Sequence, residues 1–310
     1  MSAPLRIGTR ASALARTQSG WVAERLSRTL ATDVELVDVT TFGDVSREPL
    51  AEIGGTGVFV TAVRDALLRD RVDVAVHSLK DLPTQPAPLL TLAAVPARED
   101  PRDALVARNG LTLAELPPGS TVGTGSPRRT AQLNALGLGL EVLPVRGNVD
   151  TRLDMVANGK LDAVVLARAG LARLGRLEEI TEVLDPLQML PAPGQGALAV
   201  ECRARDAELA AAVGLALDDF STRTAVAAER TLLSALEAGC SAPIGALAEV
   251  VDGGDGDELW LRGVVVAVTG RPLIRLSATG RPDDPVGVGR QLADQMLADG
   301  AGSIVKEPVT

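Results

Sequence analysis

The segment 77–83, His-Ser-Leu-Lys-Asp-Leu-Pro, carries reactive side chains directly after an apolar run. Residues 72–76 are apolar apart from one aspartate, which is typical of a parallel strand buried on both faces. In open α/β sheets, ligands bind at the carboxyl ends of strands, so Asp81 lies where catalysis commonly takes place. A turn-capping Asp81 beside a solvated Lys80 explains the local pattern equally well.

Arginines recur where predicted strands end and predicted helices begin: Arg10, Arg128, Arg129, Arg146, Arg152 and Arg173. Helix N-termini favour anions, and guanidinium groups bind carboxylates through two parallel hydrogen bonds. Any one of these arginines could simply pair with a nearby Asp or Glu, but this explanation is weaker for all six together. Two domains facing each other with these arginines across a cleft would form a polyanion site.

The two cysteines have different surroundings. Cys202 ends an apolar strand and is expected to pack in the core, whereas Cys240 lies in an irregular loop, residues 239–245. A loop thiol can be a nucleophile or an attachment point, but nothing nearby in the sequence lowers its pKa. With His77 as the only histidine, a metal site is not expected. Walker and G-x-S-x-G motifs are absent.

Composition excludes several classes of protein. The chain has 310 residues and a formal net charge of −9, so it has no basic surplus to neutralise nucleic-acid phosphates. With two Trp, three Phe and no Tyr, it also has few side chains on which bases could stack. No nucleic-acid partner is therefore expected. No apolar run approaches the ~20 residues of a membrane span, and we expect no membrane association. The N-terminus has no signal-peptide pattern. We therefore expect a cytoplasmic protein with reduced thiols.

The predicted elements alternate between strands and helices and repeat once. Residues 121–129 repeat the order of residues 6–12: a strand, a Gly-Thr turn, a serine cap and a helix. Asp162 leads an apolar strand just as Asp73 leads 74–76. This similarity indicates a duplicated α/β unit. Residues 41–57 follow neither the apolar periodicity of a strand nor that of a helix, and they are expected to form a long loop.

A strand at 197–202 could return the chain to the first unit and create a two-segment crossover. A third unit begins with a helix at 222–237, followed by strands near 244–251, 258–269 and 272–278 and by a helix at 286–299. We therefore expect three domains: residues 1–98 with 197–216, residues 99–196, and residues 217–310. The last is expected to be a small α+β domain.

Six segments in order resemble one family, porphobilinogen deaminase, also called hydroxymethylbilane synthase. They are residues 7–12 (Ile-Gly-Thr-Arg-Ala-Ser), 77–83, 123–129 (Gly-Thr-Gly-Ser-Pro-Arg-Arg), 146–153 (Arg-Gly-Asn-Val-Asp-Thr-Arg-Leu), 193–196 (Pro-Gly-Gln-Gly) and 239–240 (Gly-Cys). The resemblance implies an α/β fold with two doubly wound, periplasmic-binding-protein-like domains with mixed sheets. It also implies a small α+β C-terminal domain that carries the cofactor cysteine.

The resemblance implies a transferase that joins four porphobilinogen molecules head to tail and releases ammonia, giving hydroxymethylbilane for tetrapyrrole biosynthesis. A dipyrromethane cofactor would be held by a thioether to Cys240. Asp81 would be the catalytic carboxylate, stabilising positive charge on pyrrole nitrogens, with Lys80 beside it. The pyrrole acetate and propionate groups would be held by cofactor-binding and substrate-binding residues: Arg10, Ser12, Gln18, Thr124, Ser126, Arg128, Arg129, Arg146, Arg152 and Arg173.

The sequence also departs from the family. Glu52 and Thr56 stand where many relatives carry lysine, and Pro127 follows Ser126 where leucine is more usual. The resemblance further implies a monomer that passes its product to uroporphyrinogen III synthase. The alternative from another class is a solute-binding or sensor protein that holds a dicarboxylate without turnover. A dipyrromethane adduct on Cys240 would distinguish the two.

Overall fold

The computed structural model describes residues 3–40, 58–236, 242–254 and 256–306. The chain divides into two compact units: unit 1 is residues 1–99 with 197–223, and unit 2 is residues 100–196 with 224–310. The structure thus groups residues 224–310 with residues 100–196, and the separate third domain beginning at residue 217 stays a prediction.

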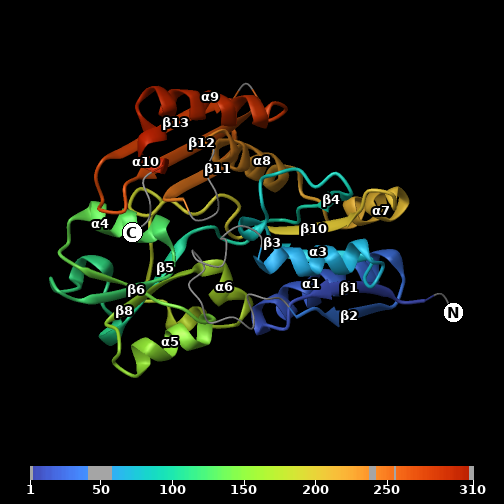
Figure 1. Ribbon diagram of the computed structural model, residues 1–310, viewed down its shortest axis with the longest axis horizontal. Coiled ribbons are helices and arrows are strands. Elements are labelled where there is room, and N and C mark those ends of the chain that lie inside the picture. Colours follow the sequence, from blue (N-terminus) through green and yellow to red (C-terminus); the bar gives the residue numbers. More distant parts are fainter. Residues whose placement is uncertain (1–2, 41–57, 237–241, 255, 307–310) are drawn as a thin grey trace. The chain divides into compact units, whose positions relative to one another are not determined.

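Unit 1 contains a mixed five-stranded sheet of order β2-β1-β3-β10-β4 (Figure 1). Its strands are β1 (Leu5–Thr9), β2 (Val34–Asp38), β3 (Val74–Ser78), β4 (Leu90–Ala94) and β10 (Leu198–Arg203). The first three strands are parallel, and β10 is antiparallel to both β3 and β4. The strand expected at 197–202 therefore joins the sheet built by the first hundred residues.

Helices cover both faces of this sheet, which explains why β3 is apolar throughout. They are α1 (Ala13–Leu30), α3 (Val58–Leu68) and α7 (Ala207–Leu217). Val74 and Val76 pack in one core cluster with side chains of α1 and α7, whereas Ala75 packs in another with α3. Alternate residues of a strand point to opposite faces, so a strand covered on both sides needs a continuous apolar run.

Unit 2 contains a second mixed sheet, of order β7-β6-β8-β5-β9. Its strands are β5 (Asp103–Ala107), β6 (Thr121–Thr124), β7 (Glu141–Pro144), β8 (Ala163–Ala167) and β9 (Glu182–Val183), and its helices are α4 (Pro127–Leu136), α5 (Val149–Ala157) and α6 (Arg168–Arg173). Again three strands are parallel and the next is antiparallel. This shared arrangement fits the expected duplication.

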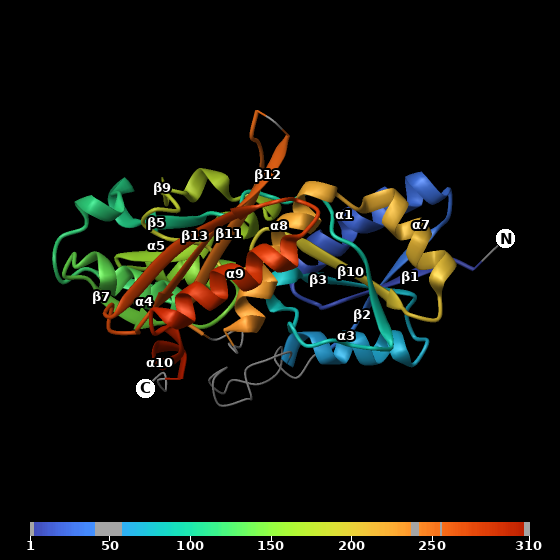
Figure 2. The same ribbon diagram turned by 90° about the horizontal axis from the view of Figure 1, so that it is seen from above.

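The remaining part of unit 2 is an antiparallel sheet, β11 (Ile244–Asp252), β12 (Asp257–Val266) and β13 (Leu273–Gly280), in sequence order. It packs with α8 (Phe220–Ala235), α9 (Pro285–Ala298) and α10 (Ala301–Lys306), and Figure 2 shows α9 lying along the sheet. The predicted strand 258–269 runs three residues past the observed end of β12 at Val266. A turn at Gly270, which has a φ of +92°, ends the strand early.

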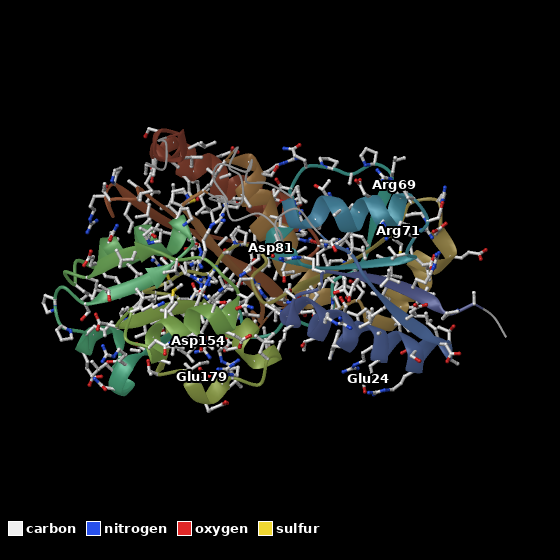
Figure 3. The ribbon with its side chains drawn as sticks, turned by 60° about the horizontal axis from the view of Figure 1, so that its bottom comes forward. Glu24, Arg69, Arg71, Asp81, Asp154 and Glu179 are labelled. Atoms are coloured by element: carbon white, nitrogen blue, oxygen red, sulfur yellow. The ribbon has the colours of Figure 1, made fainter. Side chains whose placement is uncertain are left out.

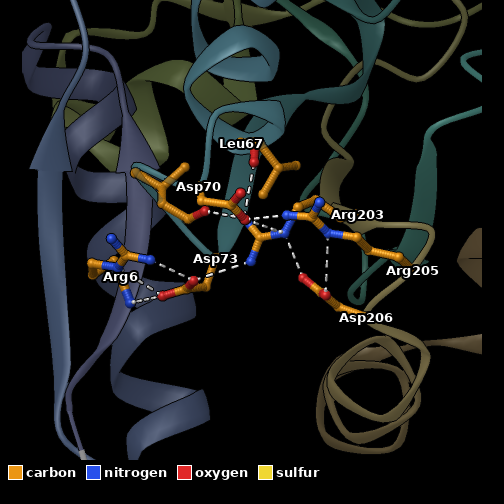
Figure 4. Close-up of polar contacts among 8 residues, drawn as sticks. Arg6, Leu67, Asp70, Asp73, Arg203, Arg205 and Asp206 are labelled. Carbon is orange, nitrogen blue, oxygen red and sulfur yellow. Dashed lines mark hydrogen bonds and ion pairs between the residues drawn. The ribbon is translucent and has the colours of Figure 1, made fainter.

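Polar residues close the amino-terminal ends of the unit 1 strands. The Asp73 carboxylate accepts hydrogen bonds from Arg6 Nε (3.0 Å), Arg6 Nη2 (2.8 Å) and Arg203 Nη2 (3.1 Å) (Figure 4). Arg203 also donates to the Leu67 and Val72 carbonyls, at 2.9 and 2.5 Å. This cluster therefore joins β1, β10 and the chain leading into β3.

In unit 2, Asp162 holds the corresponding place and accepts from both the backbone N–H and the hydroxyl of Thr121, each at 2.9 Å. An aspartate thus fastens the start of the third parallel strand in both units. Among the described residues, no helix is both long enough and apolar enough to cross a membrane.

Candidate active site

The loop after β3 holds the predicted catalytic pair. Leu79–Asp81 is a 3₁₀ helix whose buried Leu79 donates its N–H to the Ala197 carbonyl at 3.0 Å and accepts from the Leu82 N–H at 3.0 Å. Lys80 and Asp81 are partly exposed. Asp81 lies beyond the end of β3, whereas Arg71 precedes this strand (Figure 3). The loop is therefore rigidly anchored, and it presents Asp81 at the carboxyl end of the strand, as the sequence predicts.

Three further predicted residues lie beside this loop or at the end of β1. Gln18, buried in α1, exchanges hydrogen bonds with the Ser78 hydroxyl, at 3.0 and 3.2 Å. Ser12 is the N-cap of α1, and its Oγ accepts from the Ala15 N–H at 3.3 Å. Arg10 is partly buried in the turn between β1 and α1. The Gln18–Ser78 contact thus links α1 to the residue that opens the Asp81 turn.

Behind the loop lies a buried ion-pair network that the sequence does not reveal. Glu201 of β10 accepts from Arg64 of α3 at 2.9 and 2.7 Å, and its Oε2 lies 3.2 Å from His77 Nε2. Burial raises the pKa of Glu201, but His77 and Arg64 lower it more strongly, to about 2. His77 Nε2 therefore lies within ion-pair distance of Glu201, four positions before Asp81.

In unit 2, two predicted arginines occupy the first turn of α4. Arg128 and Arg129 are only 3% and 5% exposed. The fully buried Asp103 accepts from Arg128 Nη2 at 2.8 Å and from Arg129 Nη2 at 2.7 Å. Pro127 fits the first helical position, where a missing N–H costs nothing. The helix start thus holds a compact, charge-rich group.

Arg152 of α5 adds a positive charge that lacks such a partner. Its Nε is buried and has no hydrogen-bond partner within the part of the chain that the structure describes. Burial, followed by the charges of Arg129 and Arg146, lowers the pKa of Arg152 to about 10. A Cβ added to Gly125 would lie 2.6 Å from the Val145 carbonyl oxygen and 3.6 Å from Arg152 Nη2. Glycine is therefore required here by the Val145 carbonyl, at a position next to the Arg152 guanidinium.

The predicted binding residues Thr124 and Ser126 lie in the turn between β6 and α4. Thr124 is buried at the end of β6, and its Oγ1 accepts from the Ser126 N–H at 3.2 Å. Ser126 is the N-cap of α4, but its hydroxyl makes no capping hydrogen bond. Thr124 and Ser126 therefore lie beside Arg128 at the helix start, whereas Arg146 is exposed before α5.

One positional expectation is wrong. Arg173 does not lie where a helix begins: it is the last residue of α6, and its Nη2 donates to the Gly196 carbonyl at 2.6 Å. A cation at a helix C-terminus is favoured by the helix dipole. Arg152, by contrast, lies near the start of α5, Val149–Ala157.

Some predicted residues cannot be placed. Cys240, Glu52 and Thr56 lie outside the described residues. Sequence reasoning also missed Asp103, Gln195 and Glu201, whose only signal is a charged or amide side chain within or beside an apolar strand, and Arg64, which lies on the helix α3. Among the described residues, no group of His, Cys, Asp and Glu side chains could hold a metal ion.

Unit 2 thus has the features of an α/β protein that binds a carboxylate-rich ligand, because buried guanidinium groups outnumber the carboxylates beside them. Two family models match the chain: "Porphobilinogen deaminase, dipyromethane cofactor binding domain" over residues 5–211, and "Porphobilinogen deaminase, C-terminal domain" over residues 223–298. The chain belongs to the porphobilinogen deaminase family.

Two relatives of high sequence identity agree with this assignment. Porphobilinogen deaminase 1 of Streptomyces avermitilis is 58% identical, covering 98% of each chain. Porphobilinogen deaminase of Mycolicibacterium paratuberculosis is 58% identical, covering 97% of this chain and 96% of its own. Among solved structures, an ABC transporter periplasmic substrate-binding protein from Coxiella burnetii is 11% identical, with a TM-score of 0.43 over 67% of this chain and 91% of that chain.

The residues present fit the family's cofactor. A dipyrromethane carries acetate and propionate arms, and it requires donors that are not already neutralised inside the protein. Arg152 Nε and Arg128 Nε are both buried without a hydrogen-bond partner among the described residues. Buried unpartnered N–H groups of charged side chains are costly, and a carboxylate would satisfy them.

Proposed function

We propose that this protein catalyses the reaction of its family. It condenses four porphobilinogen molecules head to tail, with loss of ammonia, to hydroxymethylbilane in tetrapyrrole biosynthesis, and it is a transferase that uses a dipyrromethane cofactor. The single observation that best supports this at the level of residues is Arg152: a half-buried guanidinium with lowered pKa and an unpartnered Nε. Such a group favours a ligand rich in carboxylates.

Asp81 is the proposed catalytic carboxylate. Loss of ammonia from porphobilinogen and attack by a neighbouring ring leave positive charge on pyrrole nitrogens. A carboxylate held by an anchored turn stabilises this charge without reorganising, and it can accept a proton from the pyrrole N–H. The buried Leu79 and the Gln18–Ser78 hydrogen bonds keep the turn in place. Lys80, beside it, is proposed to attract the carboxylate arms.

The remaining predicted residues are proposed to hold the acetate and propionate groups. Arg152 and Arg146 offer guanidinium donors that Asp103 does not neutralise, and the Ser126 hydroxyl is not used in capping. Arg128 and Arg129 contribute charge from the first turn of α4. The full proposed set of binding residues is Arg10, Ser12, Gln18, Lys80, Asp81, Thr124, Ser126, Arg128, Arg129, Arg146, Arg152 and Arg173.

Cys240 is the proposed attachment point, through a thioether. When bound, the dipyrromethane supplies the pyrrole end that is elongated. The attachment needs to form only once, which agrees with a sequence that places no activating partner beside the thiol. From the family resemblance, we also propose a cytoplasmic monomer that passes its product to uroporphyrinogen III synthase.

Intact mass and one carboxylate variant test the proposal. The purified protein should carry a dipyrromethane adduct that is lost in Cys240→Ser. Asp81→Asn should fold and bind porphobilinogen but lose kcat by about 100-fold or more, because the anion that stabilises the cationic intermediates is missing. Asp33→Asn, which changes an exposed aspartate of unit 1, is the control and should turn over normally.

Two results would contradict the proposal. A bare sequence mass after incubation with porphobilinogen, together with tight porphobilinogen binding, would indicate a solute-binding protein. Turnover by Asp81→Asn close to that of Asp33→Asn would remove the catalytic role from Asp81.

A further inference from the structure

Asp103 is a fully buried carboxylate that the proposed chemistry does not use. Its Oδ2 accepts from Arg128 Nη2 at 2.8 Å, and its Oδ1 accepts from Arg129 Nη2 at 2.7 Å and from Gln195 Nε2 at 2.8 Å. Burial raises the pKa of Asp103, but the two arginines lower it more, to about 2. Asp103 is therefore ionised at neutral pH and is a permanent internal counter-charge.

Backbone carbonyls complete the fixation of both guanidinium groups. Arg128 Nη1 donates to the Leu190 carbonyl at 2.5 Å, and Arg129 Nη1 donates to the Val165 carbonyl at 2.9 Å. Each planar guanidinium thus bonds both to the Asp103 carboxylate and to a fixed carbonyl, and these two directions determine its orientation. Arg128 keeps one buried N–H, at Nε, that no described residue accepts.

The position of Asp103 is itself secured from a distant part of the chain. Gln195 Nε2 donates to the Pro101 carbonyl at 2.7 Å as well as to Asp103 Oδ1. Both segments lie where the chain enters and leaves the first portion of unit 2. One amide therefore ties the entering and leaving segments to the carboxylate that orients the α4 arginines.

The net charge of the group formed by Arg128, Arg129 and Asp103 also depends on the ionised Asp103 carboxylate. With Asp103 ionised, Arg128 and Arg129 together carry one excess positive charge; without it, two neighbouring buried guanidinium groups would repel each other. Removing one partner of a buried ion pair leaves an uncompensated charge and releases the orientation of the other partner. A carboxylate ligand binds best to donors that are already oriented, because little entropy is then lost on binding.

We infer that Asp103 is a positioning residue for the cofactor-binding arginines: it fixes the orientation of Arg128 and Arg129 so that carboxylate arms of the dipyrromethane meet preformed donors. The inference rests on the proposed function. It assigns to Asp103 a role in cofactor loading that is separate from its role in stability.

The test compares two variants of unit 2 that both destabilise it. Asp103→Asn keeps the shape and removes the charge, whereas Leu184→Ala removes a fully buried leucine of the same core and leaves the arginines unchanged. Cofactor-free proteins are mixed with porphobilinogen below both Tm values, and the dipyrromethane adduct is followed by intact mass. We expect loading to be at least about tenfold slower in Asp103→Asn, and normal in Leu184→Ala despite its lower Tm.

The outcomes separate the inference from the proposed function. Loading of Asp103→Asn that is less than about tenfold slower than that of Leu184→Ala would overturn the inference while leaving the function intact. A wild-type chain that never gains the adduct would overturn the proposed function itself. If Asp103→Asn does not fold, the variant Gln195→Leu replaces it. Loading slower than wild type by about threefold or more then supports the inference, and any smaller slowing overturns it.

Discussion

Two charged clusters of this protein are built from the same residue types and have opposite electrostatic character. The balanced cluster, in unit 1, contains three arginines and three aspartates: Arg6, Arg203, Arg205, Asp70, Asp73 and Asp206 (Figure 4). The unbalanced cluster, in unit 2, contains four arginines around one aspartate: Arg128, Arg129, Arg146, Arg152 and Asp103. In the first, each charge meets its opposite within the protein.

The pKa shifts of Asp73 and Arg152 reflect this difference between the two clusters. Burial raises the pKa of Asp73, but hydrogen bonds from Arg6 and Arg203 outweigh it, and the net pKa is lowered, so folding favours the charged form. The pKa of Arg152 is lowered to about 10, so folding disfavours its charged form at neutral pH. A shift of this size corresponds to an upper limit of about 3 kcal/mol. The balanced cluster thus stabilises the fold. The unbalanced cluster carries an unfavourable electrostatic free energy, which an anionic ligand would reduce.

The largest expected effect comes from breaking the balanced cluster. Arg203→Met should lower the free energy of unfolding by about 3 kcal/mol, because Asp73 and Asp206 lose a buried partner and two backbone carbonyls lose a donor. The kcat/KM of the folded variant should stay near normal. Urea unfolding and steady-state kinetics at 25 °C measure both quantities.

The matched control is Arg205→Met. The Arg205 side chain is 63% exposed and pairs only at the surface with Asp70 and Asp206. Exposed ion pairs contribute about 0–1 kcal/mol, so this variant should unfold almost like the wild type. Equal losses in the two variants would show that burial does not determine the strength of the cluster.

Much of this architecture could be predicted from local patterns. The apolar run of β3 predicts a strand covered on both faces, and Pro127 after Ser126 predicts the start of α4, because both signals lie within a few residues. The expected position of Asp81 after β3 follows from the same local reasoning. The predictions fail where a turn overrides propensity, as at Gly270.

The buried counter-charges could not be predicted in this way. Asp103 pairs with arginines 25 and 26 positions further along the chain, and Gln195 reaches it from 92 positions away. Glu201 follows the apolar residues 198–200 in β10, and its Arg64 partner is 137 positions distant. A buried carboxylate is tolerated only when such a partner arrives, and nothing in the adjacent sequence indicates which partner that is.

The next largest effect comes from removing the excess charge of the unbalanced cluster. Arg152→Met should reduce kcat/KM for porphobilinogen about 30–100-fold, or about 2–3 kcal/mol, through the loss of a charge-assisted carboxylate contact. Its unfolding midpoint should stay the same or rise, because a half-buried charge without a described carboxylate partner has been removed.

Arg108→Met is the control for this variant, since Arg108 is half exposed and its Nη1 lies 3.7 Å from Asp162. It should leave kcat/KM unchanged. A large drop in the unfolding midpoint of Arg152→Met would place Arg152 with the structural arginines of unit 1 and remove the contrast between the clusters.

The smallest expected effect is a change in Tm on citrate binding, which tests the contrast between the two clusters without substrate. In a Cys240→Ser background, which carries no adduct, citrate should raise Tm, because a polycarboxylate supplies the missing negative charge; at ten times its Kd the gain is about 1.4 kcal/mol. Sodium chloride at equal ionic strength should give less, since simple screening acts weakly on buried charge. Adding Arg152→Met should abolish the citrate shift, whereas adding Arg205→Met should preserve it. A citrate shift that survives the loss of Arg152 would mean that the anion binds elsewhere, and that the four arginines of unit 2 are not the unsatisfied charge of this protein.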